Sequence, residues 1–241
     1  MVPAQGNLGP GVVAFTTSRD FDPDPGTAWD VGGERLLGLF RDLGLPPPRR
    51  LVFAGQVHGV AAGRVPEDLD SQEGLLARIP QRDVLVTAET DTFLVIRTAD
   101  CLPICLADAQ AGVVAAAHAG WRGSYDSVVG AAVAEMIRLG ARPDRVQGWI
   151  GPRISGDRFE VSPELARDFE RRWGYLGGFT DGRMVDLAVL NGLQAGEAGM
   201  APEALKDSGF CTFAREETFH SHRRQGRRRG QLYTVCGMVE T

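Results

Sequence analysis

Three residues with the chemistry of metal ligands stand where predicted strands end. His58 lies in GQVHG after one apolar stretch, Cys101 lies in ADCLP after a second, and His118 opens HAGWRG after a third. If these strand ends lie side by side, two imidazoles and a thiolate converge, and Zn²⁺ prefers such ligands. Three protein ligands leave a fourth position open for water or substrate, as in catalytic zinc sites. The chain has no CxxC pair that would complete a closed structural site.

The same residue types allow other interpretations. Cys101 could be the nucleophile of a Cys–His hydrolase with a histidine as its base. A single buried cysteine also commonly serves as a small apolar side chain, and a histidine beside glycines is often a turn residue. The spacing of the residues does not decide between these possibilities.

The HAGWRG turn, residues 118–123, adds features of an anion site. Gly120 and Gly123 would let the backbone approach a ligand closely, and the amides of a following helix would point at an anion. Arg122 offers a planar, bidentate donor suited to phosphate. Trp121 offers a flat apolar face for a purine, although a core tryptophan is an equally good interpretation. The turn is therefore predicted to hold a metal with His118 and an oxyanion with Arg122.

Strand and helix patterns indicate how these residues are positioned. Several predicted strands are continuous apolar runs, which is typical of strands buried on both faces. The predicted strands are Val12–Thr17, Arg50–Ala54, Asp83–Thr87, Phe93–Thr98, Pro103–Leu106, Gly112–His118, Arg145–Ile150 and Gln231–Gly237. The predicted helices cover 34–44, 126–140, 162–173 and 186–199, and Asp126, Ser162 and Asp186 are the expected N-caps. Since strands outnumber helices without strict alternation, we predict an α+β fold with a large mixed sheet in a single domain, residues 1–241.

Composition excludes several classes of protein. The 241 residues carry a formal net charge of −5, which does not favour binding to nucleic acid. The basic run RRQGRRR, 223–229, is interpreted as a solvated loop, with a phosphate-binding patch as the alternative. The N-terminus lacks the pattern of a signal peptide and no apolar run is long enough to span a bilayer. We therefore expect a cytoplasmic protein, without a membrane partner, whose four cysteines are reduced.

Several motifs in order along the chain resemble the YfiH-like family, also called laccase-domain or multicopper polyphenol oxidoreductase proteins. They are QVHG (56–59), TADCLPI (98–104), AAAHAGWRGS (115–124), GWIGPRIS (148–155), FEV (159–161), CTF (211–213), SHRR (221–224) and RRGQ (228–231). Members of this family are also described as purine nucleoside phosphorylases with adenosine deaminase and methylthioadenosine phosphorylase activity. The resemblance implies a single-domain α/β sandwich with mixed sheets, similar to some cysteine hydrolases.

The resemblance also implies a single zinc ion held by His58, Cys101 and His118. The chain differs from the family in its first part. The N-terminal segment is compressed to SRDFDPDPGTAWD, 18–30, and the usual Asn-Arg pair is Glu34-Arg35.

The leading functional hypothesis is a zinc-dependent purine nucleoside phosphorylase that acts on adenosine, inosine or guanosine with inorganic phosphate. Arg122 would place the phosphate, with assistance from Arg35, Arg223 or Arg224. Deamination of adenosine would use water activated by zinc, with Asp100 either as the proton shuttle or as a residue that orients a ligand.

Three alternatives stay open. One is a copper oxidase of phenols, which is disfavoured because four histidines are too few for a multicopper centre. The others are a zinc-binding partner protein without catalysis and a cysteine-type hydrolase of amide bonds. The oligomeric state is not determined by the sequence.

Overall fold

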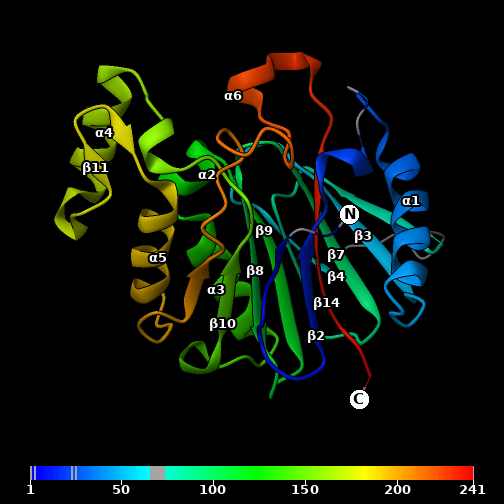
Figure 1. Ribbon diagram of the computed structural model, residues 1–241. Coiled ribbons are helices and arrows are strands. Elements are labelled where there is room, and N and C mark those ends of the chain that lie inside the picture. The colour runs from blue at the N-terminus through cyan, green and yellow to red at the C-terminus, as the bar shows by residue number, and fades with distance from the viewer. Residues whose placement is uncertain (1, 3, 23, 25, 66–73, 241) are drawn as a thin grey trace.

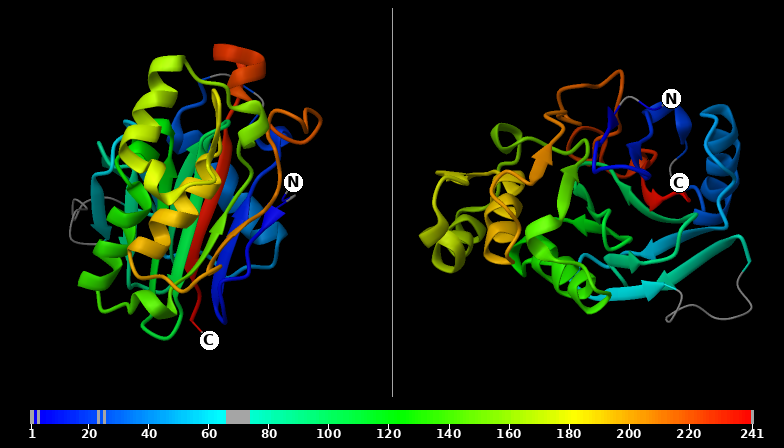
Figure 2. Two further views of the ribbon diagram at one scale, coloured as in Figure 1. Left: turned by 90° about the vertical axis from the view of Figure 1, so that its left-hand side faces the viewer. Right: turned by 90° about the horizontal axis from the view of Figure 1, so that it is seen from below.

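The computed structural model describes residues 2, 4–22, 24, 26–65 and 74–240. Two mixed β-sheets lie face to face in the middle of the molecule, and helices cover the outer face of each sheet (Figures 1 and 2). The predicted single-domain α/β sandwich with large mixed sheets is confirmed. The domain limits 1–241 stay a prediction.

The first sheet has six strands in the order β1-β2-β14-β7-β3-β5. Strand β7 pairs parallel with β3 and antiparallel with β14, so the sheet is mixed. Its strands are β1 (Ala4–Gln5), β2 (Val12–Thr16), β3 (Arg50–Gly55), β5 (Leu76–Pro80), β7 (Thr92–Thr98) and β14 (Leu232–Met238).

The second sheet has six strands in the order β13-β10-β8-β9-β6-β4. Strands β8 and β9 form the hairpin predicted around DAQAG, and Gly112 takes the positive φ of 71° in its turn. The strands are β4 (Ala62–Val65), β6 (Val84–Thr87), β8 (Leu102–Asp108), β9 (Val113–Ala119), β10 (Gln147–Ile150) and β13 (Leu205–Asp207). A separate pair, β11 (Thr180–Asp181) and β12 (Met184–Val185), lies outside both sheets.

Both faces of the central strands are buried, which explains their continuous apolar runs. In β7, Leu94 and Ile96 face the second sheet, whereas Phe93 and Val95 face helix α1. Three apolar layers result. One lies under α1, one lies between the sheets, and one lies between the second sheet and the remaining long helices.

Local sequence signals place two of the helices accurately. Helix α4 (Pro163–Trp173) begins after Ser162, whose hydroxyl accepts from the Leu165 amide. Helix α5 (Leu187–Glu197) begins after Asp186, whose carboxylate accepts from the amides of Ala188 and Val189. Both N-caps were predicted, because capping depends on residues within one turn.

Two other helix predictions need correction. The predicted helix 126–140 is present as α3 (Val128–Arg138), and an unpredicted short helix, α2 (Trp121–Tyr125), precedes it, separated from α3 by Ser127 with a left-handed φ of 61°. The residue before α3 is thus Ser127, and Asp126 ends α2. Helix α1 (Trp29–Asp42) begins five residues before the predicted start at Glu34. Short helical segments also occur at η1 (Arg19–Phe21), η2 (Pro143–Arg145), η3 (Gly156–Arg158), η4 (Gly174–Leu176), α6 (His222–Gln225) and η5 (Gly226–Arg228).

Buried Asp22 anchors the compressed N-terminal segment. Its carboxylate accepts hydrogen bonds from the Thr27 hydroxyl at 2.6 Å, the Arg35 guanidinium at 2.9 Å and the Tyr233 hydroxyl at 3.0 Å. Because burial and the Asp22 charge both disfavour the phenolate, the pKa of Tyr233 is raised. This segment is therefore packed against the first sheet through Tyr233 and against α1 through Arg35.

Candidate active site

The three candidate ligands come from positions where the chain passes between or along the two sheets. His58 follows β3 of the first sheet, before the chain enters β4 of the second. Cys101 lies in the short connection from β7 of the first sheet to β8 of the second. His118 lies near the end of β9. The two-sheet architecture therefore brings these residues to one edge of the sandwich.

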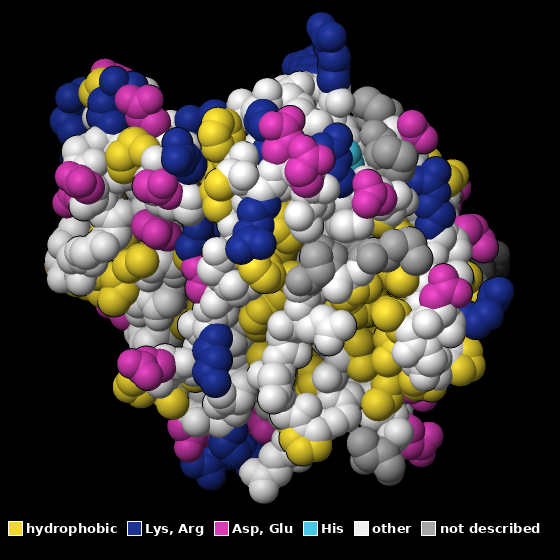
Figure 3. Space-filling view, in the orientation of Figure 1, with side chains coloured by type: hydrophobic (Ala, Val, Ile, Leu, Met, Phe, Trp, Pro, Cys, Tyr) yellow, Lys and Arg dark blue, Asp and Glu magenta, His cyan; other side chains and the backbone are white. Residues whose placement is uncertain are grey.

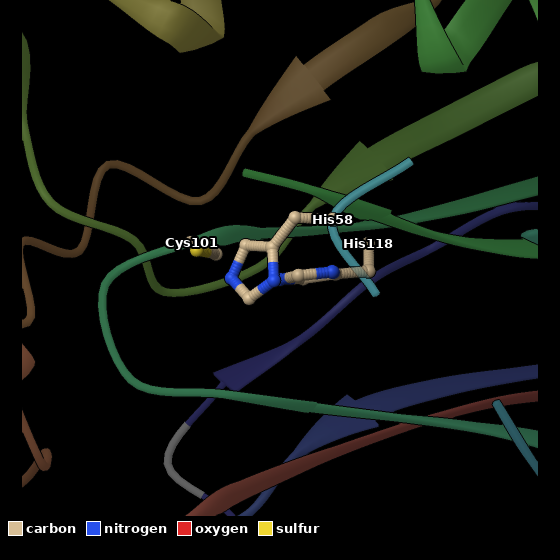
Figure 4. Close-up of side chains that lie close together, drawn as sticks. All are labelled: His58, Cys101 and His118. Atoms are coloured by element: carbon tan, nitrogen blue, oxygen red, sulfur yellow. The ribbon is translucent and has the colours of Figure 1, made fainter. Parts of the chain in front are cut away.

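The three side chains converge (Figure 4). Their candidate ligand atoms all lie within 4.8 Å of one another, and the two imidazole rings meet at 76° with centroids 4.8 Å apart. His118 is buried, Cys101 is partly buried and His58 is exposed. This is the one group of three such ligands found in the described residues, and it could hold a metal ion.

A buried carboxylate, Asp83, supports both histidines. Its Oδ1 lies 2.7 Å from Nδ1 of His118, and its two oxygens accept from the amides of Val57, His58 and Gly59. These amide bonds hold His58 in a left-handed conformation with φ of 65°, which is unusual for a residue with a side chain. Burial opposes the charge of Asp83, but the hydrogen bonds from His118 and the amides outweigh it and lower the pKa.

Electrostatics favours a thiolate at Cys101. Burial would raise its pKa, yet the charge of His118 and hydrogen bonds from both histidines lower it from 9.0 to about 6. Burial likewise would lower the pKa of His118, but the charge of Cys101 and the hydrogen bond to Asp83 raise it to about 9. Without a metal, Cys101 and His118 therefore form a thiolate–imidazolium pair near neutral pH.

A side chain at either glycine of HAGWRG would crowd its neighbours. A Cβ atom on Gly120 would lie 3.0 Å from Cδ2 of His58 and 3.3 Å from Sγ of Cys101. A Cβ atom on Gly123 would lie 3.1 Å from the carbonyl oxygen of Gly59. Gly120 thus leaves space beside all the ligands, as a site for an ion needs, and the soft sulfur with two imidazoles suits zinc.

Asp100 is part of the scaffold beside Cys101. Its Oδ1 accepts from the Thr212 hydroxyl at 2.6 Å, and its Oδ2 accepts from the Ser221 hydroxyl at 3.1 Å and the Arg223 amide at 2.6 Å. The residue has a φ of 96°, so these bonds hold a strained backbone next to the candidate ligand. Both oxygens are engaged within the protein, which fits an orienting role better than that of a free proton shuttle.

A cavity of about 500 Å³ opens beside the three ligands. Its polar lining is dominated by arginine, whereas Asp100 is its one carboxylate among the described residues. The lining residues are Gln56, His58, Arg78, Arg97, Thr98, Ala99, Asp100, Cys101, His118, Trp121, Arg122, Ile154, Phe159, Leu187, His222, Arg223, Arg229 and Gln231. This volume is in the range of small-molecule sites.

Most of the predicted substrate-binding residues line this cavity. Arg122 is exposed and stacks over Trp121, with its guanidinium carbon 4.2 Å from the ring centroid. Arg223 donates to the carbonyl of Glu160 and lies over the ring of Phe159. The helix that begins within the HAGWRG turn is α2, which has only five residues, whereas the longer predicted helix is α3 and begins later, at Val128.

Arg35 is not brought to the cavity. It lies on α1, where it donates to Asp22 and to the Phe21 carbonyl. The prediction placed it by analogy with an Asn-Arg pair, but the compressed N-terminal segment supplies a carboxylate that binds it. Arg224 is also engaged with the protein, since it donates to the carbonyls of Thr212, Phe213 and Phe219.

Sequence reasoning missed several functional candidates. Asp83 was taken only as the start of a strand, although an acidic residue at the entrance of the apolar run VLVT is a recognisable signal. Arg97 directly precedes TADCLPI and Arg229 lies within RRGQ, but neither was singled out as a site residue, whereas Arg78 is far from the motifs in sequence. The fold brings all three to the cavity.

The chain belongs to the family described as multi-copper polyphenol oxidoreductase laccase, whose sequence model matches residues 34–239. The fold agrees, since the crystal structure of YlmD from Geobacillus stearothermophilus superposes with a TM-score of 0.83 at 27% identity, over 96% of this chain and 93% of that one.

Curated relatives carry the names of purine-metabolising enzymes. A purine nucleoside phosphorylase of Xylella fastidiosa is 34% identical over 250 residues, covering 94% of this chain and 92% of the relative. One from Deinococcus radiodurans is 40% identical over 160 residues, but this match spans 65% of this chain and 61% of the relative. Adenosine deaminase RL5, from an unknown prokaryotic organism, is 35% identical over 195 residues, 76% of this chain and 73% of the relative.

In the described part of the chain, no helix is both long enough and apolar enough to cross a bilayer.

Proposed function

We propose that this protein is a zinc-dependent purine nucleoside phosphorylase. The observation that carries the proposal is the convergence of His58, Cys101 and His118 at the wall of a cavity that is rich in arginine and has aromatic and aliphatic walls. The names of the relatives support the same class of substrate.

The cavity offers separate surfaces for the two parts of the reaction. Trp121, Phe159, Ile154 and Leu187 provide an apolar lining on which a purine ring can stack or pack. The exposed guanidinium groups of Arg122 and Arg223 provide positive charge for phosphate. These two kinds of surface support the proposal that a neutral nucleoside and inorganic phosphate are the substrates.

In phosphorolysis, a phosphate oxygen forms a bond to C1′ of the ribose while the bond from C1′ to the purine nitrogen breaks. The bonding pair leaves with the purine, which takes up a proton, and ribose 1-phosphate is the second product. Zinc, when bound, would supply a Lewis acid that stabilises negative charge. Arg122 would orient the phosphate, and the apolar walls would exclude water from the reacting bond.

The supporting residues hold this arrangement in place. Asp83 fixes the ring orientation of His118, and an orienting carboxylate of this kind is common beside metal-ligating histidines. We assign Asp100 a positioning role, because it ties the Cys101 connection to Thr212 and to the C-terminal segment at Arg223.

Adenosine deamination is a second candidate activity of the same site. The relative named adenosine deaminase RL5 favours it. It would replace the exocyclic amine of the base with oxygen from water and release ammonia, without a requirement for phosphate.

A cysteine-type hydrolase is the competing hypothesis, because a thiolate–imidazolium pair such as that of Cys101 and His118 is also found in enzymes with an activated cysteine nucleophile. The copper oxidase hypothesis is weaker than the other two. The chain has only four histidines, which is too few for a multicopper centre. One of them, His220, is engaged within the protein, since its Nε2 lies 3.1 Å and 3.0 Å from the carbonyl oxygens of Arg19 and Asp22.

The deciding experiment combines metal analysis with product detection. We expect one zinc per chain, release of ribose 1-phosphate from inosine and phosphate, and loss of both zinc and turnover in Cys101→Ala and His118→Ala, with circular dichroism unchanged. Ammonia released from adenosine would report deamination separately. Full phosphorolysis by either variant would refute the site, and activity that survives zinc removal but is lost on alkylation of Cys101 would establish the hydrolase instead.

A further inference from the structure

Two polar side chains on one wall of the cavity have buried atoms without a hydrogen-bond partner. Thr98 ends β7 and is 2% exposed, yet its hydroxyl has no partner among the described residues. Arg229 comes just before β14, and its Nε is likewise buried and unpaired. Since Thr98 is paired with Leu232 of β14, the first sheet brings both residues to this wall.

Unpaired hydroxyls are not the rule in these sheets. Thr16 and Thr234 are equally buried and share a hydrogen bond of 2.7 Å, and Thr87 donates to the carbonyl of Val65. Buried polar groups in proteins are nearly always satisfied, so an exception on a cavity wall indicates a partner that is a ligand. Thr98 differs from these residues in lining the cavity.

The charges around Arg229 favour an anion as that partner. The negative groups whose charge acts on it are Asp100 and Cys101. Asp100 already accepts three hydrogen bonds, and the Cys101 sulfur faces the two histidines. The described lining of the cavity holds five arginines against the single carboxylate of Asp100, so positive charge is in excess.

We propose that Thr98 and Arg229 form an oxyanion subsite that binds a phosphate group. This inference rests on the proposed function and extends it. The exposed Arg122 and Arg223 would attract the anion, the basic side chains at the top of Figure 3 add positive charge near α6, and the buried donors would hold the anion inside. The phosphate is either the free inorganic co-substrate or the 5′-phosphate of a purine nucleotide, because both present the same tetrahedral oxyanion.

Calorimetric titration of the zinc-loaded protein tests the subsite and distinguishes the two sources. The ligands are inorganic phosphate, inosine and inosine 5′-monophosphate. Thr98→Val keeps the shape of the side chain and removes the hydroxyl, and Arg229→Met removes the guanidinium. The matched control is Arg171→Met, which removes an equal charge from the exposed face of α4.

If the occupant is free phosphate, Arg229→Met should weaken phosphate binding roughly tenfold or more, and Thr98→Val should weaken it several-fold. The ratio of nucleotide affinity to inosine affinity should then be the same in the variants and the parent. If the occupant is the 5′-phosphate of a nucleotide, inosine 5′-monophosphate should bind more tightly than inosine, and both variants should reduce this difference in affinity. The control should match the parent protein in every titration.

The subsite is refuted if both variants bind phosphate and the nucleotide as tightly as the parent, or no more weakly than the control. Steady-state kinetics provide an independent reading, since loss of a phosphate-binding group should raise KM for phosphate more than it lowers kcat. Failure of the proposed function is distinguishable. In that case no purine nucleoside is cleaved by the parent protein, whereas the differences in phosphate binding persist.

Discussion

Nδ1 of His118 lies 2.7 Å from Oδ1 of Asp83, and both side chains are buried. The same carboxylate accepts from the His58 amide at 2.9 Å, so one residue orients two candidate ligands from opposite sheets. Asp83 is 35 residues from His118 and 25 residues from His58. The site therefore depends on a group outside the motifs that contain the ligands.

Asp83→Asn should weaken zinc binding about 10- to 100-fold, because a neutral amide orients the imidazole less well and stabilises its charge less. Competition with a chromophoric chelator would measure the affinity. Asp108→Asn is the matched control, since Asp108 is also buried and hydrogen-bonded but lies at the end of β8, before the β8–β9 turn. Equal zinc affinity in Asp83→Asn and the parent would show that the carboxylate does not support the site.

Gly120→Ala should reduce zinc occupancy and turnover, because its new methyl group would crowd His58 and Cys101. Gly192→Ala provides the comparison, as nothing lies within 4 Å of a Cβ at that position in α5. Removing a helical glycine there should stabilise the fold by about 0.5–1 kcal/mol. Thermal melts and metal analysis of both variants would check this pair, and a fully loaded Gly120→Ala would mean that the ion does not need this space.

The metal-free protein should show a pH-dependent thiol. Because the pKa of Cys101 falls to about 6, its alkylation by iodoacetamide should reach half of its maximal rate near pH 6, well below the ordinary value of 9.0. Peptide-resolved mass spectrometry separates this signal from Cys211. In His118→Asn the midpoint should rise, and bound zinc should protect the thiol. A midpoint near 9 in the parent would contradict the ion pair.

The same pair gives the metal-free fold a defined pH window. The lowered pKa of Cys101 contributes stability above 9.0 that is lost as the pH falls through about 6. The raised pKa of His118 contributes stability below 6.5 that is lost as the pH rises through about 9. Because their mutual attraction requires both charges, denaturant titrations should show that it stabilises the fold between about pH 6 and pH 9. Cys101→Ala should remove this attraction and leave the part of the His118 shift that Asp83 causes.

Asp22→Ala should destabilise the protein by about 3 kcal/mol, because it leaves the buried Tyr233 hydroxyl without its acceptor and frees the N-terminal segment. Arg35→Ala should cost only about 1 kcal/mol, as the Arg35 side chain is 37% exposed. Urea denaturation would measure both. A marked rise in KM for either substrate in Arg35→Ala would show instead that Arg35 contacts the substrate.

Local and periodic features of this chain could be predicted from sequence. The caps at Ser162 and Asp186 act within one turn, and the apolar runs that became β7 and β9 are long enough to identify without tertiary information. Strands β4, β5 and β13 were missed, since they are short and include polar residues such as Arg64, Arg78 and Lys206. Ser127 gave no local sign of the left-handed turn that divides α2 from α3.

The sequence by itself determined the donor types, two imidazoles and a thiol, and their places at strand ends. Tertiary structure alone decided which charges surround them. Pairing of residues far apart in the chain assigned Asp83 to His118, diverted Arg35 to Asp22 and carried Thr98 and Arg229 to the cavity wall. The physical reason is that ligand chemistry belongs to single side chains, whereas pKa, burial and hydrogen-bond satisfaction are properties of neighbours that only the packed sheets supply.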